Sequence, residues 1–140
     1  MPGKKHGENK RAHLAMIQGV VDRMAGNLFY LRGWIITLVA GALVLLTQVE
    51  SGQYPVVFLS LTTILFWIYD GYFLALERMY RDLYDKVRTM KEEEIDFSMD
   101  ITEFKRLKKN SLFYCIFSPT LRYFYGFLLA ATAYVFFFVK

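Results

Sequence analysis

Polar side chains recur at helical spacing within the apolar stretch 54–76. Four of them share about a third of a helix circumference: Ser60, Thr63, Trp67 and Asp70. An ionised Asp70 facing lipid would cost several kcal/mol, so this carboxylate must face a partner or water. We predict either an ion pair with Arg32 or Arg122, which fall near the same depth, or a carboxylate that faces an ion pathway.

Four basic residues are packed into five positions just before the apolar run 112–117; we call them the basic cluster: Lys105, Arg106, Lys108 and Lys109. Anionic lipid headgroups would suit this cluster, at about 1 kcal/mol for each basic residue near the membrane surface. Phosphates of a nucleotide-derived ligand would suit it as well, because Tyr and Phe residues lie nearby for base stacking. Both kinds of ligand fit the pattern.

Small residues follow a seven-residue spacing from the N-terminal region into the first apolar stretch. After Ala12 come the members that we call the small-residue ladder: Gly19, Gly26, Gly33 and Ala40. Glycine costs about 1 kcal/mol relative to alanine inside a helix. Close approach of a neighbouring helix would offset this cost, as in membrane helix pairs with small residues at their interface. Local flexibility and chance are the alternatives.

Residues for catalysis or metal binding are scarce. The chain has two histidines, His6 and His13, both near the N-terminus, and one cysteine, Cys115. A single cysteine forms no internal disulfide and no cysteine-built zinc site. Walker, GxGxxG, HExxH and GxSxG patterns do not occur in the sequence. We therefore predict a protein that is not an enzyme and that binds no metal and no cofactor.

The composition indicates which elements must position these residues. Hydrophobic residues make up 55% of the 140 residues, and charged residues still make up 21%. Apolar and charged residues must then lie in separate blocks, which is typical of an integral membrane protein with extensions outside the bilayer. Three apolar stretches are candidate spans: 33–49, 54–76 and 118–140, the last opened by a Ser-Pro pair that suits a helix start. We predict an all-α integral membrane protein with about three transmembrane helices.

Apolar residues keep helical spacing outside these spans too. One series begins at Leu14 and continues into the first span through Leu38 and Leu45, and a second runs from Leu76 to Met90. Charges four residues apart between positions 77 and 86 can pair along the same helix surface. Two such helices joined by a short turn must be antiparallel, which predicts a helical stalk beside the membrane.

Basic residues are distributed unevenly about the spans. Sixteen of the 17 Lys and Arg residues lie on one side, and none lies in the turn 50–53. By the positive-inside rule that side is the cytosol. We predict a flexible basic tail at 1–12, a helical hairpin at 13–90 with a cytosolic stalk, a cytosolic or interfacial segment at 91–117, and a C-terminus outside.

Four sequence runs resemble a family of small bacterial membrane proteins: residues 66–72 (FWIYDGY), 77–84 (ERMYRDLY), 96–100 (DFSMD) and 117–120 (FSPT). In architecture the chain is similar to the SLATT effectors of anti-phage defence, and it also resembles the Hailong-type channel effectors. The resemblance covers residues 12–126. It implies a pore in the bacterial inner membrane and a signal made by a partner nucleotidyltransferase.

Together these features predict an oligomeric ion channel effector that is gated by an oligonucleotide or cyclic nucleotide on its cytosolic side. Three spans are too few to enclose a hydrated pore, so we expect a homo-oligomer, with a tetramer among the candidate sizes, in contact with membrane lipids. The alternative is a non-conducting membrane adaptor that anchors a soluble partner.

Overall fold

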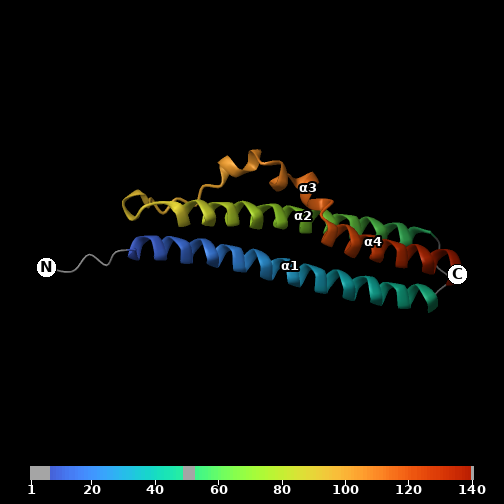
Figure 1. Ribbon diagram of the computed structural model, residues 1–140. Coiled ribbons are helices and arrows are strands. Elements are labelled where there is room, and N and C mark those ends of the chain that lie inside the picture. The colour runs from blue at the N-terminus through green and yellow to red at the C-terminus, as the bar shows by residue number, and fades with distance from the viewer. Residues whose placement is uncertain (1–6, 49–52, 140) are drawn as a thin grey trace.

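Two long antiparallel helices form the frame of the molecule. The computed structural model describes residues 7–48 and 53–139. Helix α1 covers Glu8–Gln48 and helix α2 covers Tyr54–Thr89; the two lie close together at the end where α1 begins and separate toward the end that carries the C-terminus (Figure 1). Within the described ranges there are helices and turns but no strand, which confirms the all-α prediction.

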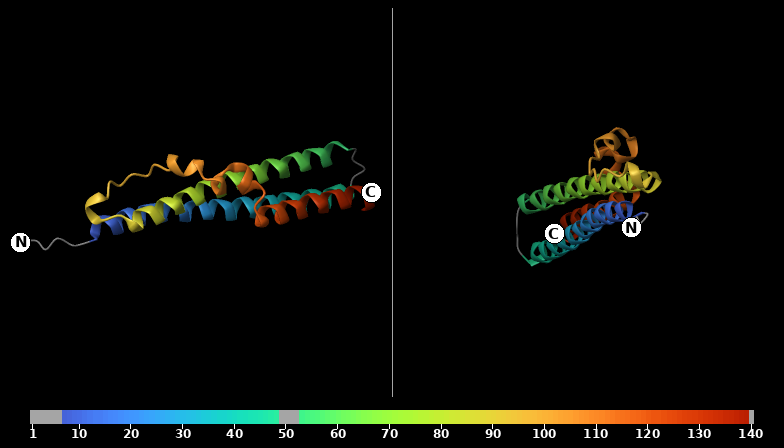
Figure 2. Two further views of the ribbon diagram at one scale, coloured as in Figure 1. Left: turned by 45° about the horizontal axis from the view of Figure 1, so that its top comes forward. Right: turned by 90° about the vertical axis from the view of Figure 1, so that its left-hand side faces the viewer.

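The rest of the chain covers the two ends of this frame differently. Helix α4 (Pro119–Tyr134) lies along the end that carries the C-terminus and continues as a π-helical turn at Val135–Val139. Residues 91–117, which we call the return segment, run back along α2 toward the start of α4 (Figure 2). The segment contains three 3-10 turns and one short helix: η1 (Glu92–Glu94), η2 (Thr102–Arg106), η3 (Lys108–Asn110) and α3 (Leu112–Ile116).

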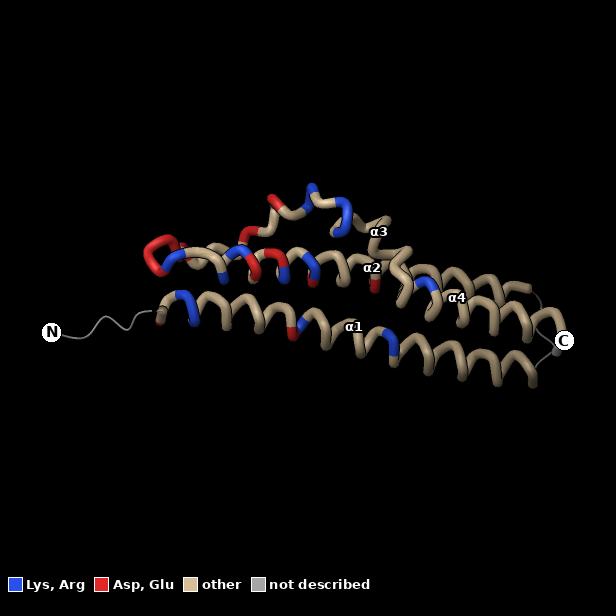
Figure 3. The backbone as a smooth tube through the Cα atoms, viewed as in Figure 1, with Lys and Arg blue, Asp and Glu red and all other residues tan. Residues whose placement is uncertain are grey.

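Among the residues that the structure describes, three helices are long and apolar enough to cross a membrane: α1, α2 and the stretch Pro119–Phe138. The 41 residues of α1 and the 36 residues of α2 extend about 60 and 54 Å, whereas a bilayer core is about 30 Å thick. Charged residues occupy one half of the bundle, and the end with the C-terminus is free of them in the described chain (Figure 3). Each long helix therefore continues without a break from an uncharged half into a charged half, as the sequence predicts.

Both halves have an apolar core, but a different third element completes each one. In the uncharged half, Ile35 and Val39 of α1 pack with Leu59 of α2 and with Leu121 and Leu128 of α4. In the charged half, the buried residues Ile17, Leu83 and Val87 are covered by apolar side chains of the return segment: Ile95, Met99, Ile101 and Phe104. The return segment thus takes the place that α4 has in the other half.

In the second half of α1, the buried positions lie one residue later in the sequence than the apolar series predicts. Ile35, which belongs to the apolar series that begins at Leu14, is fully buried as predicted, but the next buried positions are Val39 and Leu46. Leu38 and Leu45, which the pattern places in the seam, are 42% and 66% exposed. A straight helix drifts by about 20° per heptad relative to a 3.5-residue repeat, so the buried face moves along the sequence.

The boundary predicted for the flexible tail at 1–12 is wrong, because α1 already begins at Glu8. The carboxylate of Glu92 in the return segment accepts hydrogen bonds from the backbone N–H groups of Asn9 (2.8 Å) and Lys10 (3.2 Å). These groups have no partner within the helix, and an acidic side chain there also interacts favourably with the helix dipole. The remaining tail residues, 1–6, lie outside the described part of the chain.

Close helix packing occurs at a glycine outside the small-residue ladder. A Cβ atom added to Gly71 would lie 2.5 Å from Ile116 Cγ1 and 3.2 Å from the Ile116 backbone, so α3 rests directly on α2. At Gly19, Gly26 and Gly33 an added Cβ would meet nothing within 4 Å, and Ala40 is exposed. Within the single chain the ladder therefore faces open space, and the close helix packing predicted at these residues does not occur there.

We expect Gly71→Ala to lower the free energy of unfolding by about 1–3 kcal/mol, because α3 must move to admit the methyl group. The matched variant Gly26→Ala should leave stability unchanged or raise it by up to about 1 kcal/mol through helix propensity. Reversible denaturant unfolding in mild detergent measures both. Equal stability of the two variants would contradict the close contact between α3 and α2.

Candidate functional site

A buried carboxylate joins three helices where the charged and uncharged halves meet. Asp70 is fully buried and accepts two hydrogen bonds from Arg32 of α1, from Nε to Oδ2 at 2.8 Å and from Nη2 to Oδ1 at 3.0 Å. Arg122, the other predicted partner, is exposed and lies over the ring of Tyr123 at 5.2 Å. Of the alternatives open for Asp70, the structure therefore has the ion pair with Arg32.

The same carboxylate connects to α4 and, through Trp67, to α3. The hydroxyl of Tyr125 donates to Asp70 Oδ2 at 3.0 Å, and the Tyr125 ring is stacked on Trp67 with 5.8 Å between centroids. Trp67 Nε1 donates to the carbonyl oxygen of Ile116 at 2.8 Å. A charged, bidentate pair is stronger and more directional than a neutral hydrogen bond. This junction, which we call the Asp70 junction, thus links α1, α2, α3 and α4.

The rest of the predicted polar stripe also points into the chain. Thr63 is fully buried, and its hydroxyl donates to the carbonyl oxygen of Leu59 one turn earlier at 2.9 Å. Ser60 and Trp67 are half-buried. Within one chain the stripe is therefore packed against neighbouring helices, and an ion path along it would require these contacts to open.

The basic cluster lies on the exposed side of the return segment. Lys105, Arg106 and Lys108 are exposed, and no ion pair involves them among the described residues. Lys109 differs, because its ammonium group pairs with Asp82 of α2 at 2.5 Å, and Asn110 donates to the same carboxylate at 2.7 Å. The first three cations are free to meet an anion, whereas Lys109 holds the segment in place.

Charged side chains of α2 form ion pairs with the return segment as well as with one another. Of the predicted pairs along the helix, Glu77 and Arg81 meet at 2.7 Å. Lys86 pairs instead with Glu103 of the return segment at 2.6 Å. Together with Asp82, these groups hold a segment that has little regular structure of its own.

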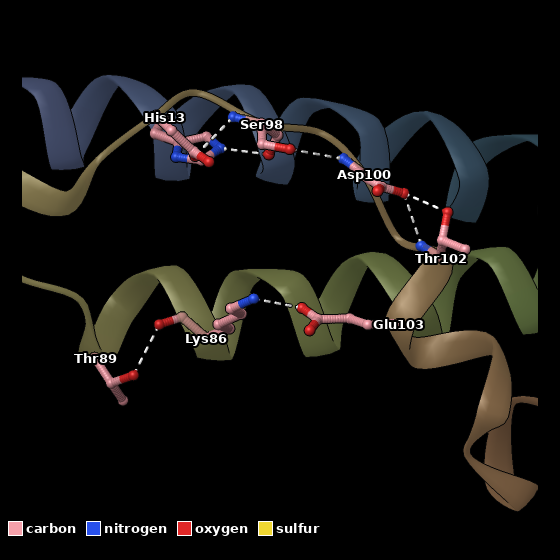
Figure 4. A network of polar contacts seen from close by, with 8 residues as sticks. His13, Lys86, Thr89, Ser98, Asp100, Thr102 and Glu103 are labelled. Atoms are coloured by element: carbon pink, nitrogen blue, oxygen red, sulfur yellow. Dashed lines mark hydrogen bonds and ion pairs between the residues drawn. The ribbon is translucent and has the colours of Figure 1, made fainter.

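A fully buried histidine fastens the return segment to α1 (Figure 4). His13 Nε2 lies 2.9 Å from the backbone oxygen of Ser98, and because a carbonyl oxygen only accepts, this nitrogen carries the hydrogen. Nearby, Thr102 donates both its hydroxyl and its backbone N–H to Asp100, which lowers the pKa of that carboxyl group. The segment is thus bound to α1 at His13 and to α2 at Lys86.

The sequence-based prediction assigned none of these contacts to several of the residues that form them. Tyr125 carried a usable signal, because a tyrosine hydroxyl inside an apolar span needs a partner. His13 and Glu92 carried none, because their partners lie more than 80 positions away in the sequence. Gly71 is adjacent to Asp70 in the sequence, but a glycine is needed at this position only because α3 rests directly on it.

Comparison of the chain with protein-family models, with curated proteins and with solved structures finds no match. In the described part of the chain, no group of three His, Cys, Asp or Glu side chains is arranged to hold a metal ion.

We expect Asp70→Asn to lower the free energy of unfolding by about 3 kcal/mol, because it leaves the half-buried Arg32 guanidinium without its counter-charge. Tyr125→Phe keeps the ring stack but removes a hydrogen bond to a charged group, which should cost about 1.5–3 kcal/mol. The double variant should lose less than the sum, since both changes act on one carboxylate. Denaturant unfolding in detergent measures all three.

Asp85→Asn is the matched control for charge removal. Asp85 and its partner Arg88 are each 64% exposed, and an exposed pair contributes at most about 1 kcal/mol. A loss in Asp70→Asn no larger than in this control would show that the Asp70 junction does not hold the helices together.

Proposed function

We propose that the chain forms an oligomeric ion channel in the bacterial inner membrane and acts as an anti-phage effector gated by a nucleotide-derived signal on its cytosolic side. The observation that carries the proposal is the continuity of α1 and α2 from the charged half into the uncharged half. A ligand that moves the charged half would move the spans directly, because helices transmit displacement as rigid elements.

The basic cluster supplies the proposed site for the signal. Lys105, Arg106 and Lys108 are exposed cations on a segment that Lys109 and Asp82 tie to α2. A phosphate bound by the cluster would either weaken the ion pair between Lys109 and Asp82 or strengthen the attachment of the segment to α2. In either case, the change reaches α2 a few turns from the Asp70 junction.

Self-association is a part of the proposal, since a bundle of three helices is too thin to enclose a hydrated pore. Gly26 and Gly33 lie one turn before Tyr30 and Thr37, so they share a helix face with them. Tyr30 and Thr37 line apolar grooves between α1 and α2, with volumes of about 470 and 400 Å³. A helix of a second chain could approach α1 closely along this face.

A second candidate function is a non-conducting membrane adaptor that anchors a soluble partner. The pairing of Asp70 with Arg32 favours it, because the polar stripe then serves helix packing and leaves no charged group to line a path. Ion flux separates the two candidates.

The positive-inside rule places the N-terminus and the return segment in the cytosol and the C-terminus outside. We expect Gln53→Cys to react with an impermeant maleimide in intact cells, and Glu93→Cys to react only after permeabilisation. Native Cys115 should react little with the maleimide, because it is fully buried. Burial also raises the pKa of its thiol, which disfavours the reactive thiolate. Labelling of both positions from outside would overturn this topology.

Purified protein in liposomes tests the channel directly. We expect ion efflux that changes when oligonucleotides or cyclic nucleotides reach the cytosolic side, and nucleotide affinity that falls steeply with salt. The triple variant Lys105→Gln, Arg106→Gln and Lys108→Gln should lose the nucleotide response, whereas Arg23→Gln, which removes an exposed cation elsewhere, should retain it. If the assembled protein gives no ion efflux under any of these conditions, the channel proposal is wrong and the membrane adaptor becomes the favoured function.

A further inference from the structure

The N-terminus of α4 opens into a pocket of about 510 Å³ between α1, α2 and α4. Ser118 precedes the helix, and a serine in this position usually accepts a hydrogen bond from one of the first backbone N–H groups. Here it makes no such bond, although α4 begins at Pro119 as the sequence predicts. Ser118 is 5% exposed, lines the pocket, and its hydroxyl has no hydrogen-bond partner among the described residues.

The first turn of α4 leaves two further donors without a partner in the helix. Pro119 has no N–H group, and the first bond that the helix makes runs from Arg122 N to the Ser118 carbonyl oxygen at 2.9 Å. The N–H groups of Thr120 and Leu121 therefore have no acceptor within α4. Open N–H groups together with the positive end of the helix dipole favour an anion.

Two arginines line the same pocket, and each has unused donors. Arg32 binds Asp70 through Nε and Nη2, so its Nη1 group remains. Arg78 donates from Nη1 to the backbone oxygen of Lys109 at 2.9 Å and to Cys115 Sγ at 3.6 Å, and its guanidinium lies over the Tyr114 ring at 5.9 Å. It forms no ion pair among the described residues, and its Nε and Nη2 groups remain available as donors. The pocket also contains Glu77, but this carboxylate is paired with Arg81 at 2.7 Å. The groups around the pocket thus carry a net positive charge.

The position of the pocket and its apolar wall point to the kind of anion. Arg32 is the last charged residue of α1 before its uncharged half, so the pocket lies where a bilayer would place its phosphate groups. Leu28, Phe29 and Leu121 form part of the wall, and Phe29 is 76% exposed. Polar donors on one side and apolar side chains on the other suit a phosphate that carries acyl chains.

We propose that this pocket is a binding site for the phosphate of a membrane phospholipid. The phosphate oxygens accept from Ser118 Oγ, from the N–H groups of Thr120 and Leu121, and from Arg78 and Arg32. The first part of the acyl chains lies against Phe29, the exposed apolar side chain of the pocket. The site is separate from the basic cluster and holds whether or not the chain conducts ions.

The test titrates the full chain in uncharged detergent with a short-chain phosphatidylglycerol and follows thermal unfolding and lipid binding. We expect the lipid to raise the unfolding temperature. Arg78→Gln should weaken lipid binding about ten-fold, as expected for loss of a charge-assisted hydrogen bond. Arg122→Gln, the control, removes a nearby arginine that is outside the pocket and should change binding by less than about two-fold.

Ser118→Ala distinguishes a ligand site from a helix cap. Because the hydroxyl makes no hydrogen bond in the structure, the variant should unfold no more easily than the parent protein without lipid, yet bind lipid about five-fold more weakly. Lower stability with unchanged lipid binding would make Ser118 a structural residue only. Unchanged binding in both Ser118→Ala and Arg78→Gln would overturn the site.

A parallel titration with inorganic phosphate and glycerol phosphate identifies the source of the phosphate. We expect neither to raise the unfolding temperature at concentrations where the lipid saturates. Competition by either one at equal concentration would overturn the lipid assignment and make the pocket a site for a soluble phosphate compound.

Discussion

A charged group buried between apolar helices limits how those helices can be arranged. An ionised Asp70 without a partner would be expensive in any low-dielectric surrounding, whether lipid or protein. The cost is offset because Arg32 and Tyr125 bring three donors to the same carboxylate. Rotation or sliding of α1 or α4 relative to α2 would break these bonds. The apolar contacts between the helices are less directional and would tolerate such movements better.

The junction also explains why the two halves of the molecule differ. On its uncharged side, α4 completes the bundle with apolar residues that suit either protein or lipid. On its charged side, the two long helices alone would leave a seam of apolar residues, such as Leu83 and Val87, open to water. The return segment covers that seam. Ion pairs with Asp82 and Lys86 hold the segment where its own 3-10 turns would be too weak.

Glycine has two different roles in this fold. At Gly71 the missing side chain lets α3 touch α2, one residue away from the carboxylate that joins the helices. At Gly19, Gly26 and Gly33 the missing side chain leaves open space along α1. The first role belongs to the folded chain, and the second makes sense as a contact surface for another chain in the proposed oligomer.

Local pattern and composition alone predicted the long helices, the three candidate spans and the start of α4 at Pro119, because these features depend on residues close together in the sequence. The burial of Asp70 followed from its place in an apolar stretch. The choice of Arg32 over Arg122 did not, because both lie at a similar depth and only the rotation of α1 and α4 decides which one reaches the carboxylate. Glu92 as the cap of α1, His13 as the anchor of Ser98 and Ile116 as the neighbour of Gly71 were likewise decided by the tertiary structure. In each case the return segment brings together residues that are distant in the sequence, and no local pattern encodes such a meeting.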